Sequence, residues 1–149
     1  LQSIKFGKRN YDFIDTLKFK YSNSQVREMR DISMRLKDAF VMRADQANVL
    51  AHYIEESPHP VVVMGDFNDT PISYAYRKIR RNLEDAFTTA GRGFGNTYAG
   101  ELPSFRIDYI LHSPSLMALE FNRIKTRFSD HFPITATLGW PVPEEVATE

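Results

Sequence analysis

The sequence predicts one α/β (α+β) domain in which a mixed, mostly antiparallel sheet is covered by helices on one face. Helix-like and strand-like segments alternate early in the chain, whereas strand-like segments follow one another through short loops in the second half. The 149 residues are about enough for one domain, and the composition, 42% hydrophobic and 13% aromatic, is typical of a globular protein. We expect residues 1–140 to form this domain and residues 141–149 to form a flexible tail.

Two amphipathic helices are expected first. Apolar residues recur every three to four positions from Val26 to Phe40, with charged residues between them, which predicts one helix. A second helix is expected from Ala44 to Ser57, because Pro58 cannot continue it.

A third helix and four strands follow. The helix is predicted over Pro71 to Arg81, with Thr70 as its N-cap and Ile72 among its inward residues. The continuous apolar run Val61–Met64 predicts a strand that is buried on both faces. Three further strands are expected at 105–111, 119–128 and 134–138. The glycine-rich loop from Thr89 to Ser104 is long enough to suggest a functional surface.

The motif Gly65-Asp66-Phe67-Asn68 places a carboxylate and a carboxamide directly after the first of these strands. A polar side chain beside a stiff strand is held in one place, which suits catalysis. Asp and Asn also cap turns by bonding to their own backbone, and the motif alone does not decide between the two roles.

Asp108 interrupts the apolar strand that continues to Leu111, so it must lie on one face of that strand. A buried carboxylate without a partner is costly, and the candidate partners are Arg106 and a histidine. An aspartate that accepts the N–H of an imidazole fixes the tautomer of the histidine and raises its basicity. Asp108 therefore predicts an orienting role toward a catalytic histidine.

His131, directly after Asp130, is the histidine that we choose. His52 lies within a predicted helix and His59 between two prolines, so both are expected on the surface. His112 lies at a strand end and is the weaker candidate.

A metal site would use oxygen or imidazole ligands, because the chain contains no cysteine. Asp130 suits a hard cation such as Mg²⁺ or Mn²⁺, with Asp66 and Asn68 as further candidate ligands. The formal net charge of zero argues weakly against non-specific binding of duplex nucleic acid.

Three motifs taken in order resemble the endonuclease/exonuclease/phosphatase superfamily, which has the DNase I-like fold. They are Gly65-Asp66-Phe67-Asn68, Arg106-Ile107-Asp108-Tyr109-Ile110 and Ser129-Asp130-His131-Phe132-Pro133. The family's fold is a two-sheet α/β sandwich built from two similar halves. The chain resembles the C-terminal half, with Leu1-Gln2-Ser3 similar to the stretch that follows the last motif of the first half.

The resemblance implies a divalent-metal-dependent phosphoesterase. Asp66 would orient or deprotonate the attacking water, and Asn68 would donate to a non-bridging phosphate oxygen. His131 would contact the scissile phosphate, Asp108 would orient His131, and Asp130 would help to hold the metal. Arg106 and Ser129 are further candidates for substrate binding.

The resemblance also implies what this chain would need from elsewhere. The N-terminal half of the family's domain supplies an asparagine, a metal-binding glutamate and a histidine that have no matching positions here. We therefore expect the chain alone to have little or no activity. We also expect its uncovered sheet face to drive association, either with the N-terminal half or as a homodimer of the chain.

The substrate class and the location stay open. Arg106-Ile107-Asp108 after Pro103-Ser104-Phe105 differs from the inositol-phosphatase pattern and is nearer the nuclease and sphingomyelinase-like branches. No apolar run approaches the roughly 20 residues that cross a bilayer, which predicts a soluble domain, although similar bacterial proteins suggest a membrane tether upstream. The alternative from another class is a non-catalytic interaction or folding half-domain, in which these aspartates only cap turns and strand edges.

Overall fold

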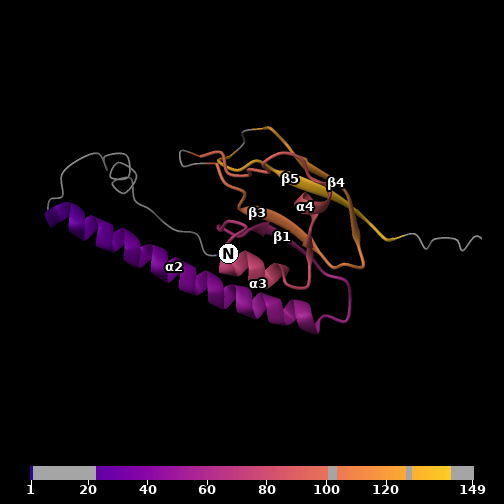
Figure 1. Cartoon of the computed structure of the whole chain (residues 1–149), viewed down its shortest axis with the longest axis horizontal. Helices are drawn as coiled ribbons and strands as arrows, with labels where there is room; N and C mark the ends of the chain where they lie inside the picture. Colours follow the sequence, from indigo (N-terminus) through magenta and orange to yellow (C-terminus); the bar gives the residue numbers. More distant parts are fainter. Residues whose placement is uncertain (2–22, 101–103, 127–128, 142–149) are drawn as a thin grey trace, which may run out of the picture.

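The computed structural model describes residue 1 and residues 23–100, 104–126 and 129–141. Residues 142–149 of the expected tail and the last two residues of the strand predicted at 119–128 lie outside the described part. The described chain combines helices with antiparallel strand pairs, as expected for this α/β fold, and Figure 1 shows helices α2 and α3 beneath the strands. Among the described residues, no helix is both long and apolar enough to cross a membrane.

Helix α2, Asn23–Glu56, is one continuous helix where the sequence predicted two. No proline or glycine interrupts it between Phe40 and Ala44, and its buried side chains recur every four residues through the expected break. These side chains are Ala39, Arg43, Ala47 and Ala51. The N-terminal part of α2 extends past the strands (Figure 1), and accordingly Met29 and Phe40, two residues of the apolar periodicity that predicts this helix, are exposed.

The first sheet contains three antiparallel strands in the order β1-β3-β2. Its strands are β1, Val62–Asp66; β2, Glu84–Asp85; and β3, Asp108–His112. Strand β3 begins three residues later than predicted, because residues 105–107 bond to the loop at Thr97 and to Phe67 instead of a neighbouring strand. The short strand β2 was not predicted.

The second sheet pairs β4, Met117–Arg123, with β5, Ile134–Gly139, in antiparallel register. A bulge between Ala118 and Glu120 interrupts the register. Strand β4 ends at Arg123, and residues 124–126 continue as a loop toward Asp130 and His131.

Two short helices connect the strands. Helix α3, Tyr74–Arg80, begins later than predicted because Ser73, not Thr70, is its N-cap; the Ser73 hydroxyl accepts from the Tyr76 amide at 3.1 Å. Ile72, expected to point inward, is 83% exposed because it lies in the turn before the helix. Helix α4, Ala86–Ala90, is capped by Asp85 and was not predicted.

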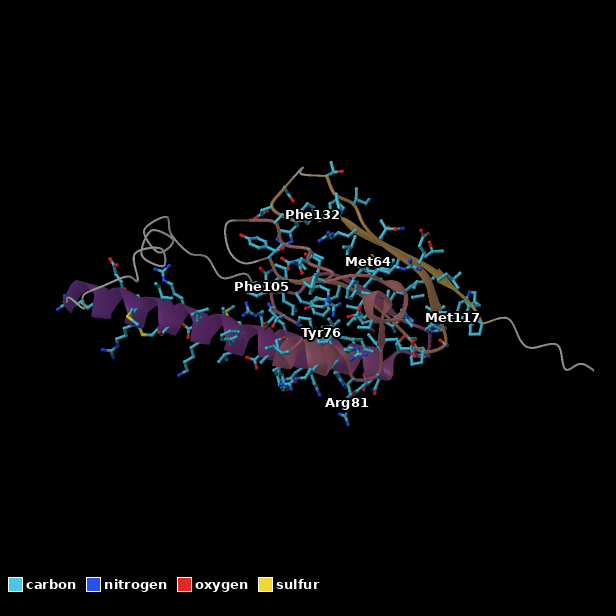
Figure 2. All side chains as sticks on the ribbon, turned by 45° about the horizontal axis from the view of Figure 1, so that its top comes forward. Met64, Tyr76, Arg81, Phe105, Met117 and Phe132 are labelled. Carbon is cyan, nitrogen blue, oxygen red and sulfur yellow. The ribbon has the colours of Figure 1, made fainter. Side chains whose placement is uncertain are left out.

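The core lies between the first sheet and helices α2 and α3. Its aromatic centre is Tyr109, whose ring centroid lies 4.8 Å from that of Phe67 and 4.6 Å from that of Tyr76. Strand β1 covers this core with one face only, so the expectation that it is buried on both faces was wrong. Met64 is 68% exposed on its other face; Figure 2 labels this side chain and that of Met117 at the start of β4.

Candidate active site

The turn after β1 places Asp66 and Asn68 on one side and the Phe67 side chain in the core. Gly65 has φ of 143°, a conformation that glycine alone adopts readily, and Asn68 has φ of 51°, where asparagine is favoured among non-glycine residues. The Asp66 carboxylate accepts from the Asn68 amide at 2.7 Å and from Asn68 Nδ2 at 2.6 Å. The local sequence thereby fixes the direction of the Asp66 carboxylate.

The backbone of Leu1 lies against the same turn. Its nitrogen donates to the Asp66 carbonyl at 2.8 Å, and its carbonyl accepts from Asn68 Nδ2 at 3.2 Å. Both Nδ2 hydrogens of Asn68 are thus engaged within the chain. Donation from Asn68 to a phosphate oxygen requires release of one of them, and the longer bond to Leu1 is the one more easily exchanged.

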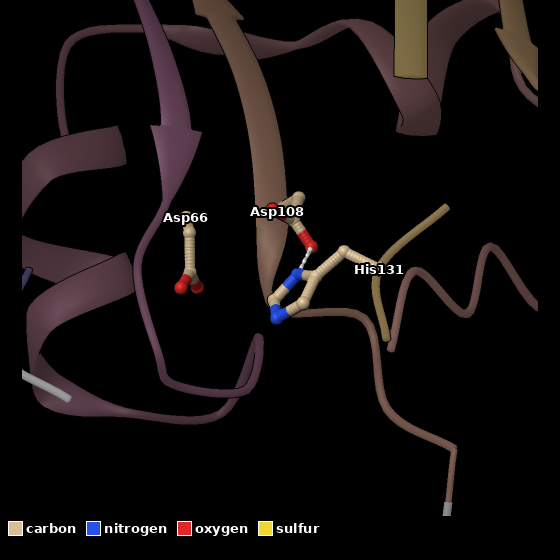
Figure 3. Close-up of side chains that lie close together, drawn as sticks. All are labelled: Asp66, Asp108 and His131. Carbon is tan, nitrogen blue, oxygen red and sulfur yellow. Dashed lines mark hydrogen bonds and ion pairs between the residues drawn. The ribbon is translucent and has the colours of Figure 1, made fainter. Parts of the chain in front are cut away.

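Asp108 and His131 form a direct pair. His131 Nδ1 lies 2.9 Å from Asp108 Oδ2, and Figure 3 shows the imidazole placed so that its other nitrogen, Nε2, points away from Asp108. The expected histidine partner of Asp108 is therefore His131. A carboxylate at this distance accepts the Nδ1 proton and leaves Nε2 to face a substrate.

Asp66 lies opposite Asp108, because the two are register partners at the end of β1 and the start of β3. Ligand atoms of Asp66, Asp108 and His131 all lie within 4.8 Å of one another (Figure 3). The structure thus brings together three of the four predicted catalytic residues from separate parts of the chain, with Asn68 bonded to the first of them.

The electrostatics follow from this crowding. Burial raises the pKa of Asp66, and the charge of Asp108 adds to the rise, against the opposing hydrogen bond from the Asn68 amide. Burial lowers the pKa of His131, but the hydrogen bond and charge of Asp108 outweigh burial, so the pKa lies above its ordinary value. Asp66 is accordingly a better proton acceptor than an ordinary carboxyl group.

The donor set fits a divalent cation. Two half-buried carboxylates within reach of each other repel unless a proton or a cation lies between them, and oxygen ligands suit Mg²⁺ and Mn²⁺. His131 Nδ1 and Asp108 Oδ2 are bonded to each other, so the carboxylate of Asp66 and the other oxygen of Asp108 are the donors that we expect to bind the ion.

Asp130 and Ser129 lie on the exposed loop before His131. The charge of Asp130 contributes to the raised pKa of His131. Its role as a metal ligand stays a prediction. The Ser129 hydroxyl bonds to the backbone of His131, accepting from its amide at 3.0 Å, so Ser129 shapes the turn that presents the imidazole. Substrate binding by Ser129 stays a prediction as well.

Arg106 does not reach the cluster. Its guanidinium is buried, pairs with Asp85, and lies 4.7 Å from the ring centroids of both Phe87 and Tyr109. Arg106 was a candidate partner of Asp108, but Asp85, 21 positions earlier in the sequence, binds its guanidinium instead. Substrate binding by Arg106 stays a prediction.

The other histidines lie where they were expected. His52 is exposed beside Glu56, and His59 is exposed after Ser57. His112 is fully buried at the end of β3, with Nδ1 3.0 Å from the Ser113 carbonyl.

Two residues at the site were missed. Thr97 lies behind Asp108, and the Tyr98 ring packs edge-on against the His131 imidazole with centroids 5.5 Å apart. Both belong to the glycine-rich loop expected to be a functional surface. The signal that could have identified them is a β-branched residue and an aromatic residue together within that loop.

Comparison with known proteins identifies the family of this chain. Residues 29–131 match the profile of the endonuclease/exonuclease/phosphatase family. A search of curated proteins found no match.

Several solved structures share the fold. An endonuclease/exonuclease/phosphatase from Bacteroides vulgatus is 30% identical, with a TM-score of 0.56 over 66% of this chain and 44% of that one. A protein of unknown function from Enterococcus faecalis is 20% identical, with a TM-score of 0.61 over 68% of this chain and 46% of that one. A mannosyl-6-phosphatase from Bacteroides thetaiotaomicron is 22% identical, with a TM-score of 0.54 over 70% and 47%.

The present chain thus spans less than half the length of these three structures. The profile match covers more than half of the chain, including Asp66, Asn68, Asp108 and His131. The chain belongs to the endonuclease/exonuclease/phosphatase family.

Proposed function

We propose that the protein containing this chain is a divalent-metal-dependent phosphoesterase. The observation that carries the proposal is that Asp66, at the end of β1, and Asp108, at the start of β3, lie beside His131, with ligand atoms of all three within 4.8 Å of one another. A general base, an oriented imidazole and a cation site in one place are the groups that phosphate-ester hydrolysis needs.

Asp66 acts on the attacking water in this proposal. Its raised pKa makes it a stronger base than an exposed aspartate, and its two hydrogen bonds from Asn68 hold the carboxylate in one orientation. Asn68 donates to a non-bridging phosphate oxygen after giving up its contact with Leu1.

His131 contacts the scissile phosphate through Nε2. Asp108 holds the Nδ1 proton and so fixes both the tautomer and the direction of the ring. The elevated pKa of His131 favours the protonated ring, which meets the charge that develops on the phosphoryl oxygens.

Mg²⁺ or Mn²⁺ is the cation that we propose. Asp66 and Asp108 would contribute to holding it, with Asp130 as a further ligand from the neighbouring loop. When bound, such an ion supplies positive charge to the phosphate oxygens.

We propose that an N-terminal half upstream of Leu1 completes the site. In a longer protein the preceding residue would be joined to the Leu1 nitrogen, which lies 2.8 Å from the Asp66 carbonyl. That half would also cover exposed apolar side chains of β1 and β4, which include Val62, Met64, Met117 and Leu119. We expect the chain by itself to be nearly inactive and to associate through these side chains, for example as a homodimer.

The nuclease and sphingomyelinase-like branches remain the substrate classes that we propose. The Bacteroides thetaiotaomicron mannosyl-6-phosphatase shares the fold at 22% identity, which sets no substrate for this chain. A substrate panel should therefore include a phosphodiester and a phosphomonoester.

The test is turnover of bis(p-nitrophenyl) phosphate and p-nitrophenyl phosphate by the intact protein with Mg²⁺. Asp66→Ala and His131→Ala should each abolish turnover while the circular dichroism spectrum and melting temperature stay close to those of the wild type. Asp45→Ala and His52→Ala, which change exposed residues of α2, are the matched controls and should retain activity. Full activity of Asp66→Ala would overturn the proposal, and loss of folding in both site variants would favour the non-catalytic half-domain.

A further inference from the structure

Thr97 lies directly behind the Asp108–His131 pair. Its side chain is fully buried, and its hydroxyl oxygen accepts hydrogen bonds from the Ile107 amide at 3.0 Å and the Asp108 amide at 3.1 Å. These two amides are those of the residues that lead into β3. The hydroxyl therefore fixes the backbone at the point where the Asp108 side chain begins.

The backbone around Thr97 fixes the other member of the pair. The Thr97 carbonyl accepts from the Phe132 amide at 2.7 Å, and the Ala99 amide donates to the Asp130 carbonyl at 2.7 Å. Tyr98, between them, forms an isolated β-bridge with His131. The same short segment thus holds the backbone on both sides of His131.

We propose that Thr97 is the positioning residue that sets the geometry of the Asp108–His131 pair, an inference that rests on the phosphoesterase function proposed above. Thr97 connects the two segments that carry the pair. Its hydroxyl bonds to the segment of Asp108, and its carbonyl bonds to the segment of His131. Asp108 and His131 lie 23 positions apart in the chain, so their relative placement depends on tertiary contacts such as those of Thr97.

The attachment of the loop does not depend on the hydroxyl. The amides of Thr97 and Tyr98 both lie 2.9 Å from the Phe105 carbonyl, and these bonds persist when the Thr97 side chain changes. Replacement of Thr97 by valine keeps the shape of the side chain but leaves the amides of Ile107 and Asp108 without their acceptor. The expected effect is consequently local to the start of β3.

Thr97→Val and Thr97→Ser in the intact protein test the inference. Serine keeps the hydroxyl, so Thr97→Ser should behave like the wild type. In Thr97→Val we expect faster amide hydrogen exchange at Ile107 and Asp108 while Leu111, within β3, stays protected. The ¹⁵N spectrum of His131 should show loss of the single Nδ1–H tautomer.

Turnover supplies a third readout. Misplacement of a catalytic group lowers kcat more than it raises KM, so Thr97→Val should lose between about tenfold and 100-fold in kcat with KM nearly unchanged. Leu83→Ala, which removes a buried core side chain, is the control for general destabilisation and should leave the His131 spectrum unchanged.

Three results would overturn the inference. They are unchanged exchange at Asp108 in Thr97→Val, an equal loss in Thr97→Ser, or the same His131 spectrum change in Leu83→Ala. Hydrogen exchange and the His131 spectrum need no substrate, so they decide the role of Thr97 even if the wild type proves not to be a phosphoesterase.

Discussion

Asp66 and Asp108 lie directly opposite each other, as register partners across the antiparallel pair β1 and β3. Like charges in this arrangement repel, and the charge of Asp108 contributes to the raised pKa of Asp66. No lysine or arginine side chain bonds to either carboxylate in the part of the chain that the structure describes. The charge of His131 opposes this repulsion, yet the pKa of Asp66 stays raised, so a bound cation would stabilise the pair further and connects the fold to the proposed chemistry.

Mg²⁺ should therefore stabilise the intact protein even when no substrate is present. A ligand that binds only the folded state at about 100 times its dissociation constant adds about 2.7 kcal/mol of stability. We expect the melting temperature to rise with MgCl₂ and the rise to shrink in Asp66→Asn and Asp108→Asn. NaCl at equal ionic strength is the control, and Asp45→Asn should respond like the wild type. An equal response in all variants would place the cation elsewhere.

The Asp108–His131 pair should make stability depend on pH. The folded-state pKa of His131 is raised. The stabilisation that the charged imidazole gains from Asp108 is therefore fully present below the ordinary histidine pKa of 6.5 and is lost as the pH rises through the raised value. Urea unfolding in EDTA between about pH 5 and pH 9 measures this. Asp108→Asn should remove that part of the pH dependence, whereas His52→Gln should leave it in place. An unchanged profile in Asp108→Asn would contradict the role of the pair.

Tyr109 should contribute to the stability of both turns at the site. Its hydroxyl lies 2.9 Å from the Asp69 carbonyl and 2.8 Å from the Arg106 carbonyl, so it connects the turn after β1 with the approach to β3. Tyr109→Phe removes the single hydroxyl hydrogen that these two carbonyls share and should cost about 1–2 kcal/mol in urea unfolding. Tyr74→Phe, which loses an exposed bond to Asn48, is the matched control and should cost less. Equal costs would mean that the Tyr109 hydroxyl contributes no more to the free energy of unfolding than an exposed tyrosine hydroxyl does.

The predicted catalytic residues were found from local signals. Asp66 and Asn68 follow an apolar run, which predicts a position at a strand end, and Asp108 interrupts another run, which predicts a position on one face of a strand. Both positions were expected to be close to His131, and the structure places Asp66 and Asp108 with it.

The errors have a common cause in contacts between distant residues. Asp85 binds Arg106 from 21 positions away, and neither residue reveals the other in the sequence. Thr97 and Tyr98 become part of the site through hydrogen bonds to segments 10 to 35 positions away. The continuous helix α2 was divided because the buried stripe includes Arg43, a charged residue whose partner, Asp69, follows β1. Amphipathic patterns cannot identify such a buried charge.

Gly65 gives the last prediction, because its backbone sets the direction of Asp66. At φ of 143° a side chain is strained, although a Cβ there would meet no atom within 4 Å. The whole cost of Gly65→Ala is thus backbone strain, about 1–3 kcal/mol, or a shift of the turn that relieves it. Either response moves the Asp66 carboxylate relative to Asp108, so kcat should fall more than stability alone explains. Gly139→Ala is the control, since its Cβ would contact only the side chain of the exposed residue Leu119. Wild-type kcat in a destabilised Gly65→Ala would show that the turn keeps Asp66 in place without its glycine.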